Sequence, residues 1–239
     1  MNATQGGKIV RCQDLYKRYS GLGLTNDFDR PMAIDGLQHR ILGALNIQGG
    51  FGVFDEGTKK KGLLRRSLLW IRAPGTSKLD RITFPANRAI SVVPSWSWMA
   101  YTGAIDYISP DFGGVDWEEL KSPWSGPGSG DDLFWTEVQG GNIALVGEAR
   151  EYDPIKCSDP EKMSLEIDSP GGSLQPKTLC IILGRQKGVP LKEKRHYLLF
   201  IKRTANRDRR GAPLYERVGA GFLPGRCIEW SSPVRVTIH

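Results

Sequence analysis

The sequence predicts a mainly β protein of the α+β class, with a small helical N-terminal part and an antiparallel β-sandwich or barrel-like body. Two observations carry this prediction. Apolar residues recur with helical spacing only in the first 45 residues, whereas seven β-rich runs separated by turn signals fill about the last hundred. With 239 residues, the chain can bury a core without metal or disulfide staples.

Both predicted helices lie near the N-terminus. In the first, over residues 13–20, Leu15 and Tyr19 lie four positions apart on one helical face, and two glycines follow it. The second spans residues 24–45, where the polar residues ahead of Pro31 offer capping oxygens and the proline suits a first turn. Its predicted apolar stripe consists of Ala33, Leu37, Ile41 and Leu45.

From Gly49 onward, short apolar runs punctuated by glycine and proline replace the helical pattern. Residues 115–121 are predicted to form one helical turn, and Ser125–Asp132 a flexible junction. Val234, Val236 and Ile238 alternate with polar residues and should share one strand face. The predicted strands or extended segments are 49–54, 67–72, 81–85, 91–101, 142–150, 163–167, 178–184, 196–203, 215–223, 227–230 and 234–238.

These elements divide the chain into four stretches. We predict a helical N-terminal part over residues 1–48, a Trp-rich strand and loop region over 49–125, a loop junction over 126–141 and an antiparallel β region over 142–239. Together they should form one compact unit over residues 13–239, with the tryptophans between the helical part and the β body.

The formal net charge of +7 is clustered. Residues 185–210 carry a net charge of +8, so the rest of the chain carries −1. One interpretation is a set of solvated loops that keep strand ends soluble, and the same holds for Lys59–Lys61 with Arg65 and Arg66. The other is an anionic-partner site at Lys192, Lys194, Arg195, Arg207, Arg209 and Arg210. Nucleic acid is not the expected partner, because stacking aromatics are nearly absent there.

Five of the seven tryptophans fall within residues 96–135. Trp96 and Trp98 are two positions apart, so an extended backbone would place both indoles on one face. That face is either an internal seam between the helical and β portions, which large aromatics favour, or an open platform for a sugar or another small ligand. The candidate ligand or hydrolase site consists of Trp96, Trp98, Trp117, Asp106 and Asp116.

Several classes of function lack their signatures. The chain has no phosphate-binding loop, dinucleotide fingerprint or nucleophile elbow, and its three histidines have no ligand spacing, so neither a cofactor nor a metal is expected. It has no apolar run long enough to span a membrane and no secretion signal, which predicts a cytoplasmic location. The four cysteines form no C-x-x-C pair and are expected to be reduced.

Six segments of the chain are distinctive: residues 19–37, 51–57, 67–72, 93–117, 196–203 and 214–228. The most specific strings in them are PSWSWMAYTG with the following IDY, and YERVG with the later LPG. These segments resemble, in the same order, the region that follows the HET domain in fungal heterokaryon incompatibility proteins. In that family the HET domain triggers a cell-death response, and the stretch ahead of Tyr16 is too short to contain one. The resemblance implies a non-enzymatic accessory or partner-sensing module with a protein partner, a HET domain among the candidates.

Overall fold

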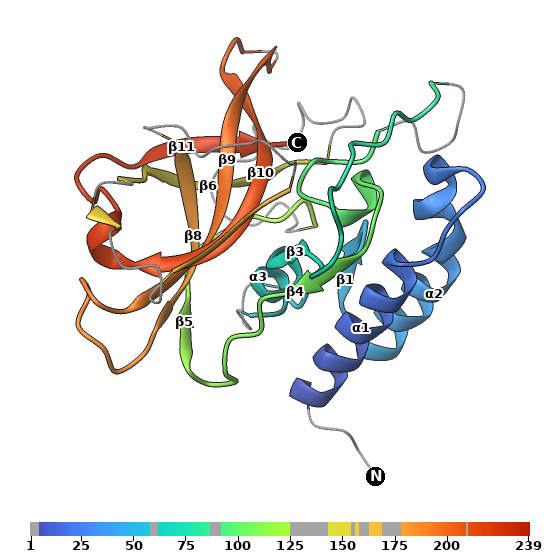
Figure 1. Cartoon of the computed structure of the whole chain (residues 1–239), viewed down its shortest axis with the longest axis horizontal. Helices are drawn as coiled ribbons and strands as arrows, with labels where there is room; N and C mark the ends of the chain where they lie inside the picture. The colour runs from blue at the N-terminus through green and yellow to red at the C-terminus, as the bar shows by residue number, and fades with distance from the viewer. Residues whose placement is uncertain are drawn as a thin grey trace.

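Two α-helices at the N-terminus and a β-barrel formed by the C-terminal half occupy opposite sides of the molecule (Figure 1). The structure, a computed structural model, describes residues 5–57, 62–86, 92–124, 143–153, 156–157, 163–168, 178–208 and 210–239. The elements of the first half are α1 (Gln5–Ser20), η1 (Asp27–Asp29), α2 (Arg30–Leu45), β1 (Gln48–Gly50), β2 (Val53–Asp55), α3 (Leu63–Leu68), β3 (Trp70–Arg72), η2 (Trp98–Ala100), β4 (Ile105–Tyr107) and β5 (Val115–Trp117).

Five strands of the second half close into a barrel. Their order is β11-β6-β8-β9-β10, all antiparallel, and β10 returns to β11 through a parallel pairing of Leu214 with Thr237 and Tyr215 with Ile238. β7 extends the sheet from β10, and β5 pairs with β8. The elements of this half are β6 (Leu145–Glu151), β7 (Ser164–Ile167), β8 (Leu179–Gln186), β9 (Arg195–Arg207), β10 (Pro213–Pro224), η6 (Gly225–Cys227) and β11 (Val234–Ile238).

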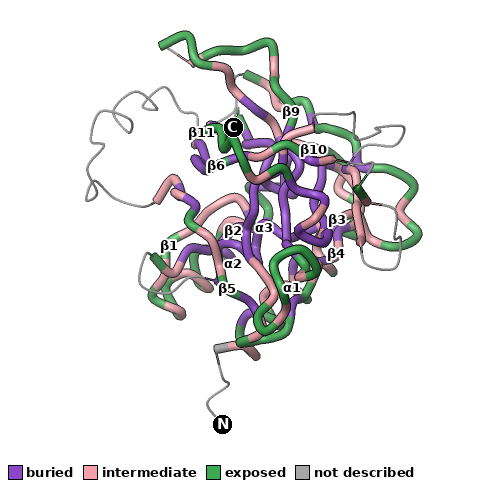
Figure 2. The backbone as a smooth tube through the Cα atoms, turned by 90° about the vertical axis from the view of Figure 1, so that its left-hand side faces the viewer, coloured by how far each residue is buried: buried purple, intermediate pink, exposed green. Residues whose placement is uncertain are grey.

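The strand β9 shows why the barrel is stable. Its residues alternate between two hydrophobic clusters, because successive side chains of a strand point to opposite faces. Leu199 and Ile201 join the main barrel core, while Leu198 and Phe200 join a second cluster on the other face. Buried residues accordingly concentrate in the centre of the molecule around these strands (Figure 2). The predicted mainly β, barrel-like body is therefore confirmed.

The helices α1 and α2 cover a separate core in the first half. Tyr16 of α1 packs its ring against Phe54 and Trp98, with ring centroids 5.5 and 5.2 Å apart. In α2 the buried side chains include Ile34 and Gln38, whereas Leu37 is exposed. The predicted apolar stripe of α2 is therefore wrong by about one position, because Gln38 turns inward to accept a 2.7 Å hydrogen bond from the Gly52 N–H.

Residues 63–68 form the helix α3, where the sequence predicted strand from residue 67 onward. The Glu56 carboxylate accepts hydrogen bonds from the first N–H groups of this helix, those of Leu63 at 2.6 Å and Leu64 at 3.1 Å. Arg65 and Arg66 are buried, not solvated as predicted. Each donates to main-chain carbonyls of residues 110–120, so these arginines fasten that long connection to α3.

Three other segments differ from their predicted structure. Residues 115–121 begin with strand β5 in place of a helical turn, because Val115–Trp117 pair with β8. Residues 81–85 contribute only an isolated bridge at Arg81, and 227–230 form no strand. The predicted junction at 125–132, the run Lys59–Lys61 and Trp135 lie outside the described residues.

A buried arginine of the barrel, paired with an aspartate of the same half, also bonds to the first half. Arg217 of β10 is 1% exposed, and its Nε atom lies 2.9 Å from Oδ2 of Asp168, which is 2% exposed. The same guanidinium donates to the carbonyls of Leu68 and Trp70, which lie at the end of α3 and in β3. One side chain therefore connects the barrel to the first half, and all of its partners are hydrogen-bond acceptors, as a buried cation requires.

Candidate functional site

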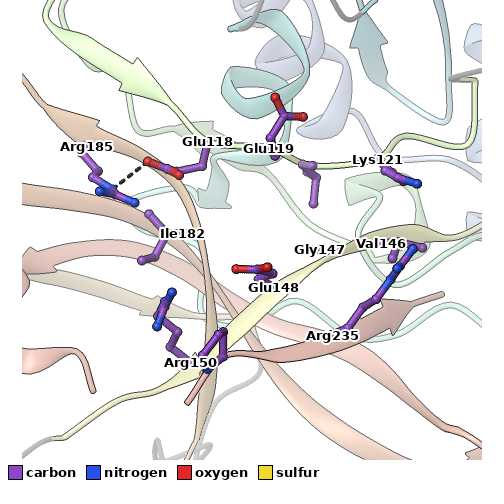
Figure 3. Close-up of a pocket in the computed structure, with 12 residues that line it drawn as sticks. Glu118, Glu119, Lys121, Val146, Gly147, Glu148, Arg150, Ile182, Arg185 and Arg235 are labelled. Atoms are coloured by element: carbon purple, nitrogen blue, oxygen red, sulfur yellow. Dashed lines mark ion pairs between the residues drawn. The ribbon is translucent and has the colours of Figure 1, made fainter. Parts of the chain in front are cut away.

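A charged groove lies on the outer face of the barrel, where β6, β8 and β11 meet the segment that follows β5 (Figure 3). Its volume is about 580 Å³. Because Leu145 and Ala149 point into the core, Glu148 and Arg150 on the same strand point outward into this groove. The charged residues that line it are Glu118, Glu119, Lys121, Glu148, Arg150, Arg185 and Arg235.

The groove forms because two neighbouring strands diverge. β6 pairs with β11 over residues 145–149 but with β8 only over 149–151. The segment after β5 crosses the resulting gap: the Glu118 N–H donates to the Leu183 carbonyl, and Lys121 exchanges two backbone hydrogen bonds with Val146. Strand backbone thus frames the groove on several sides, and such a frame holds the outward side chains in place.

An ion pair fixes one wall of the groove. The Nε atom of Arg185 lies 2.7 Å from Oε1 of Glu118, and the two side chains are 34% and 31% exposed. Figure 3 shows the pair at one end of the groove, with Glu148 and Arg150 nearby on β6. Because Glu118 contacts Nε of Arg185, the two Nη groups, which form the outer edge of the guanidinium, are left to other contacts.

Trp230 holds two arginines at this end of the groove. The Cζ atoms of Arg150 and Arg185 lie 5.3 and 5.5 Å from the centroid of its ring. Arg150 also donates from Nη1 to the Trp230 carbonyl at 2.6 Å. The indole N–H donates to the Gly225 carbonyl at 2.9 Å, so the ring itself is fixed. We call Arg150, Arg185 and Trp230 the arginine corner.

His196 packs against Trp230 of the arginine corner. Its ring packs edge-on against Trp230, with centroids 5.2 Å apart, and its Nδ1 lies 2.9 Å from the Lys194 carbonyl. Burial, together with the charges of the neighbouring Arg185 and Lys194, lowers the pKa of His196 to about 4, although the contact with the Lys194 carbonyl opposes the shift. The imidazole is therefore neutral at pH 7 and adds no charge to the corner.

Trp96 and Trp98 do not form the open ligand platform that was one of the two interpretations of the sequence. Trp96 and Trp98 are both 0% exposed, so neither indole can stack on a ligand from solution. They also do not share a face: Trp98 starts the 3-10 helix η2, and this turn sends it into the core of the first half while Trp96 joins the barrel core. The indole-rich segment therefore crosses between two interiors.

The carboxylates predicted beside these tryptophans are not brought together. Asp106 lies on β4 and binds Lys17 at 2.7 Å, whereas Asp116 lies on β5, in a different sheet, and faces Lys187 at 3.5 Å. Trp117, the remaining predicted ligand residue, is half-buried, with the Arg66 guanidinium 5.2 Å from its ring centroid. The five residues thus do not converge on one cavity.

The predicted anionic-partner residues separate into two groups at opposite ends of β9. Lys192, Lys194 and Arg195 lie at its beginning, and Arg207 and Arg210 at the far hairpin. At roughly 3.3 Å per residue, about 40 Å of strand runs between the two groups. Arg209 lies outside the described residues. The basic segment therefore does not form one patch.

Two of the four cysteines are joined in the folded chain. Cys157 and Cys227 form a disulfide with Cα atoms 5.5 Å apart, whereas Cys12 and Cys180 are free. The expectation of four reduced thiols is therefore wrong, since the fold brings together two cysteines 70 residues apart. The described part of the chain contains no cluster of metal-ligating side chains, and none of its helices could cross a bilayer.

The groove cannot be recognised in the sequence because its residues come from four separate stretches. One local signal was present: Glu148 and Arg150 interrupt an otherwise apolar strand at alternate positions, which marks an outward face. Nothing local connects that face to Arg185 or Glu118. Comparison of the chain with protein-family models, with curated proteins and with solved structures finds no match.

Proposed function

We propose that this protein is a non-enzymatic binding module and that its partner, another protein, occupies the charged groove. The observation that carries the proposal is the groove itself: seven charged side chains of both signs on strands and strand ends, around a volume of about 580 Å³. Surfaces of mixed charge set the orientation and selectivity of protein association more than its strength, which suits a partner-sensing role.

The aspartates outside the groove have cationic partners within the chain, which indicates structural roles for them. Asp106 and Asp116 each have a lysine partner, and Asp168 is committed to Arg217 in the interior. In the groove, by contrast, Glu148 is exposed and has no ion-pair partner among the described residues. The resemblance to heterokaryon incompatibility proteins makes a HET domain the first partner to test.

The test exchanges charges without changing net charge. A double variant, Glu148→Lys with Arg150→Glu, reverses two groove charges, and the matched control, Lys202→Glu with Glu216→Lys, reverses an exposed ion pair on β9 and β10. Proteins cross-linked to the chain in extracts of its source cells should be retained by the control and lost from the groove variant. Purified HET domain is tested in the same way.

If both variants retain the same proteins as the unaltered chain, the groove is not the binding surface and the proposal fails. Thermal unfolding of each variant, monitored by circular dichroism, checks that both remain folded. A groove variant with an unchanged midpoint and a lost partner supports the proposal.

A further inference from the structure

We propose that the arginine corner binds a carboxylate side chain of an acidic peptide segment, and that this segment lies extended along the groove. The inference rests on the partner-binding function proposed above and specifies the chemistry of the partner. It is carried by three observations: the balance of charge at the corner, the fixed position of its side chains and the order of charges along the groove.

The arginine corner contains two cationic side chains but only one carboxylate partner. Two guanidiniums share the ring of Trp230, but only Arg185 has a carboxylate partner, Glu118. Among the described residues no carboxylate lies in ion-pair range of Arg150, whose bond to the Trp230 carbonyl engages Nη1 alone. A guanidinium has five N–H donors, so Arg150 and the outer edge of Arg185 can still bind a carboxylate through paired hydrogen bonds.

The corner is held in place before any partner arrives. Trp230 is fixed by its bond to Gly225 and by its contact with His196, and Arg150 is fixed by its bond to the Trp230 main chain. Ordering rotamer-rich side chains opposes association, so a preformed pair of guanidiniums binds at a smaller entropic cost. His196 is neutral, which leaves the two arginines as the cations of this corner.

The remaining groove charges favour an extended segment with alternating charge. Figure 3 shows Glu148 between the arginine corner and a second cationic end formed by Lys121 and Arg235. The register places Arg235 directly opposite Glu148 on β11. In an extended peptide, alternate side chains share one face about 7 Å apart. The complementary sequence therefore has acidic, basic and acidic residues at alternate positions.

A protein segment fits this corner better than a nucleic acid. Nucleic-acid grooves combine cations with aromatic faces on which bases stack. Here the ring of Trp230 is already in contact with two guanidiniums and with His196, and Glu148 would repel a phosphate backbone. Nucleic-acid binding is accordingly an outcome that the test can detect.

The experiment measures fluorescence anisotropy of two labelled pentapeptides with the full chain at low ionic strength. The probe is Glu-Ala-Lys-Ala-Glu, and the matched control is its charge-reversed counterpart, Lys-Ala-Glu-Ala-Lys. We expect the probe to bind at least about tenfold more tightly than the control. Arg150→Ala and Arg185→Ala should each weaken probe binding about tenfold, a change of about 1.4 kcal/mol. Arg203→Ala, an exposed arginine on β9, should leave it unchanged.

The variant Arg150→Lys tests the geometry in a chain that keeps the positive charge. Lysine cannot form the paired hydrogen bonds of a guanidinium, so this variant should bind the probe more weakly than the unaltered chain. Equal affinity for both peptides, preference for the charge-reversed peptide, or tighter binding of a single-stranded oligonucleotide would overturn the inference. Groove-dependent capture of a protein with no affinity for the acidic probe would overturn this inference alone. Probe binding at the corner without any groove-dependent protein would instead overturn the proposed function.

Discussion

The Cζ atom of Arg217 lies 3.2 Å from the centroid of the Trp70 ring. The two residues come from different halves of the chain, since Arg217 lies on β10 of the barrel and Trp70 on β3. The indole N–H of Trp70 in turn donates to the Trp96 carbonyl at 2.9 Å. One stacked pair thus links a barrel strand, a short strand of the first half and the segment between the two cores.

Replacing Arg217 by methionine should destabilise the fold by about 3–5 kcal/mol, because it leaves Asp168 buried without its cation. Burial raises the pKa of Asp168, and the Arg217 charge opposes that shift. The free energy of unfolding from urea titrations measures the loss. Arg217→Met combined with Asp168→Asn should recover part of it; if the double variant is no more stable than Arg217→Met, the buried charge is not the cause.

Gly52→Ala should destabilise the fold more than Gly57→Ala. Both positions have positive φ, 75° and 81°, so alanine costs about 1–2 kcal/mol of backbone strain at either. An added Cβ at Gly52 would also lie 2.1 Å from Nε1 of Trp98, whereas at Gly57 it would meet nothing within 4 Å. Overpacking against Trp98 should therefore destabilise Gly52→Ala by about 1–3 kcal/mol more, and it should not affect Gly57→Ala. Equal free energies of unfolding for the two variants would contradict this prediction.

His196 should make stability fall in mild acid. The folded protein binds a proton at this imidazole only near pH 4, whereas the unfolded chain does so near pH 6.5. Between these values the unfolded state holds more protons, so lowering the pH should cost about 3 kcal/mol from this residue. His196→Gln should lose less stability between pH 7 and 4 than the unaltered chain; parallel losses would show that the imidazole is not responsible.

Thiol labelling tests the disulfide. The denatured, unreduced chain should react at two cysteines, Cys12 and Cys180, and at all four after reduction. In the folded chain Cys180 should react slowly, because it is buried and burial raises its pKa to about 12. Mass spectrometry counts the labels. Four labels without reductant would contradict the disulfide.

The strands of the second half could be predicted from the sequence because a single local pattern determines each of them. The strands β9 and β10 were predicted because their β-rich apolar runs show no helical period, and the seven runs of the second half were enough to predict a barrel-like body. The helix α3 was missed because its first turn is capped by Glu56, seven positions before Leu63, which no local pattern reveals.

The charged residues were predicted less well, since composition does not report what a side chain contacts. Arg66 belongs to a basic run, yet it lies buried with its guanidinium 4.2 Å from the Phe112 ring centroid. Arg185 was counted in the basic segment, but its partners, Glu118 and Trp230, lie far away in the sequence. The positions of both arginines depend on tertiary contacts with residues distant in the sequence.

The pairing of Arg217 with Asp168 spans 49 residues, and the other two bonds of the guanidinium go to main-chain carbonyl oxygens, which every amino acid supplies. The bond to the Leu68 carbonyl makes no demand on the leucine side chain, which packing in the core constrains instead, whereas the arginine and the aspartate must change together. A substitution at either position alone would bury an unpaired charge, so the two positions are constrained as one unit.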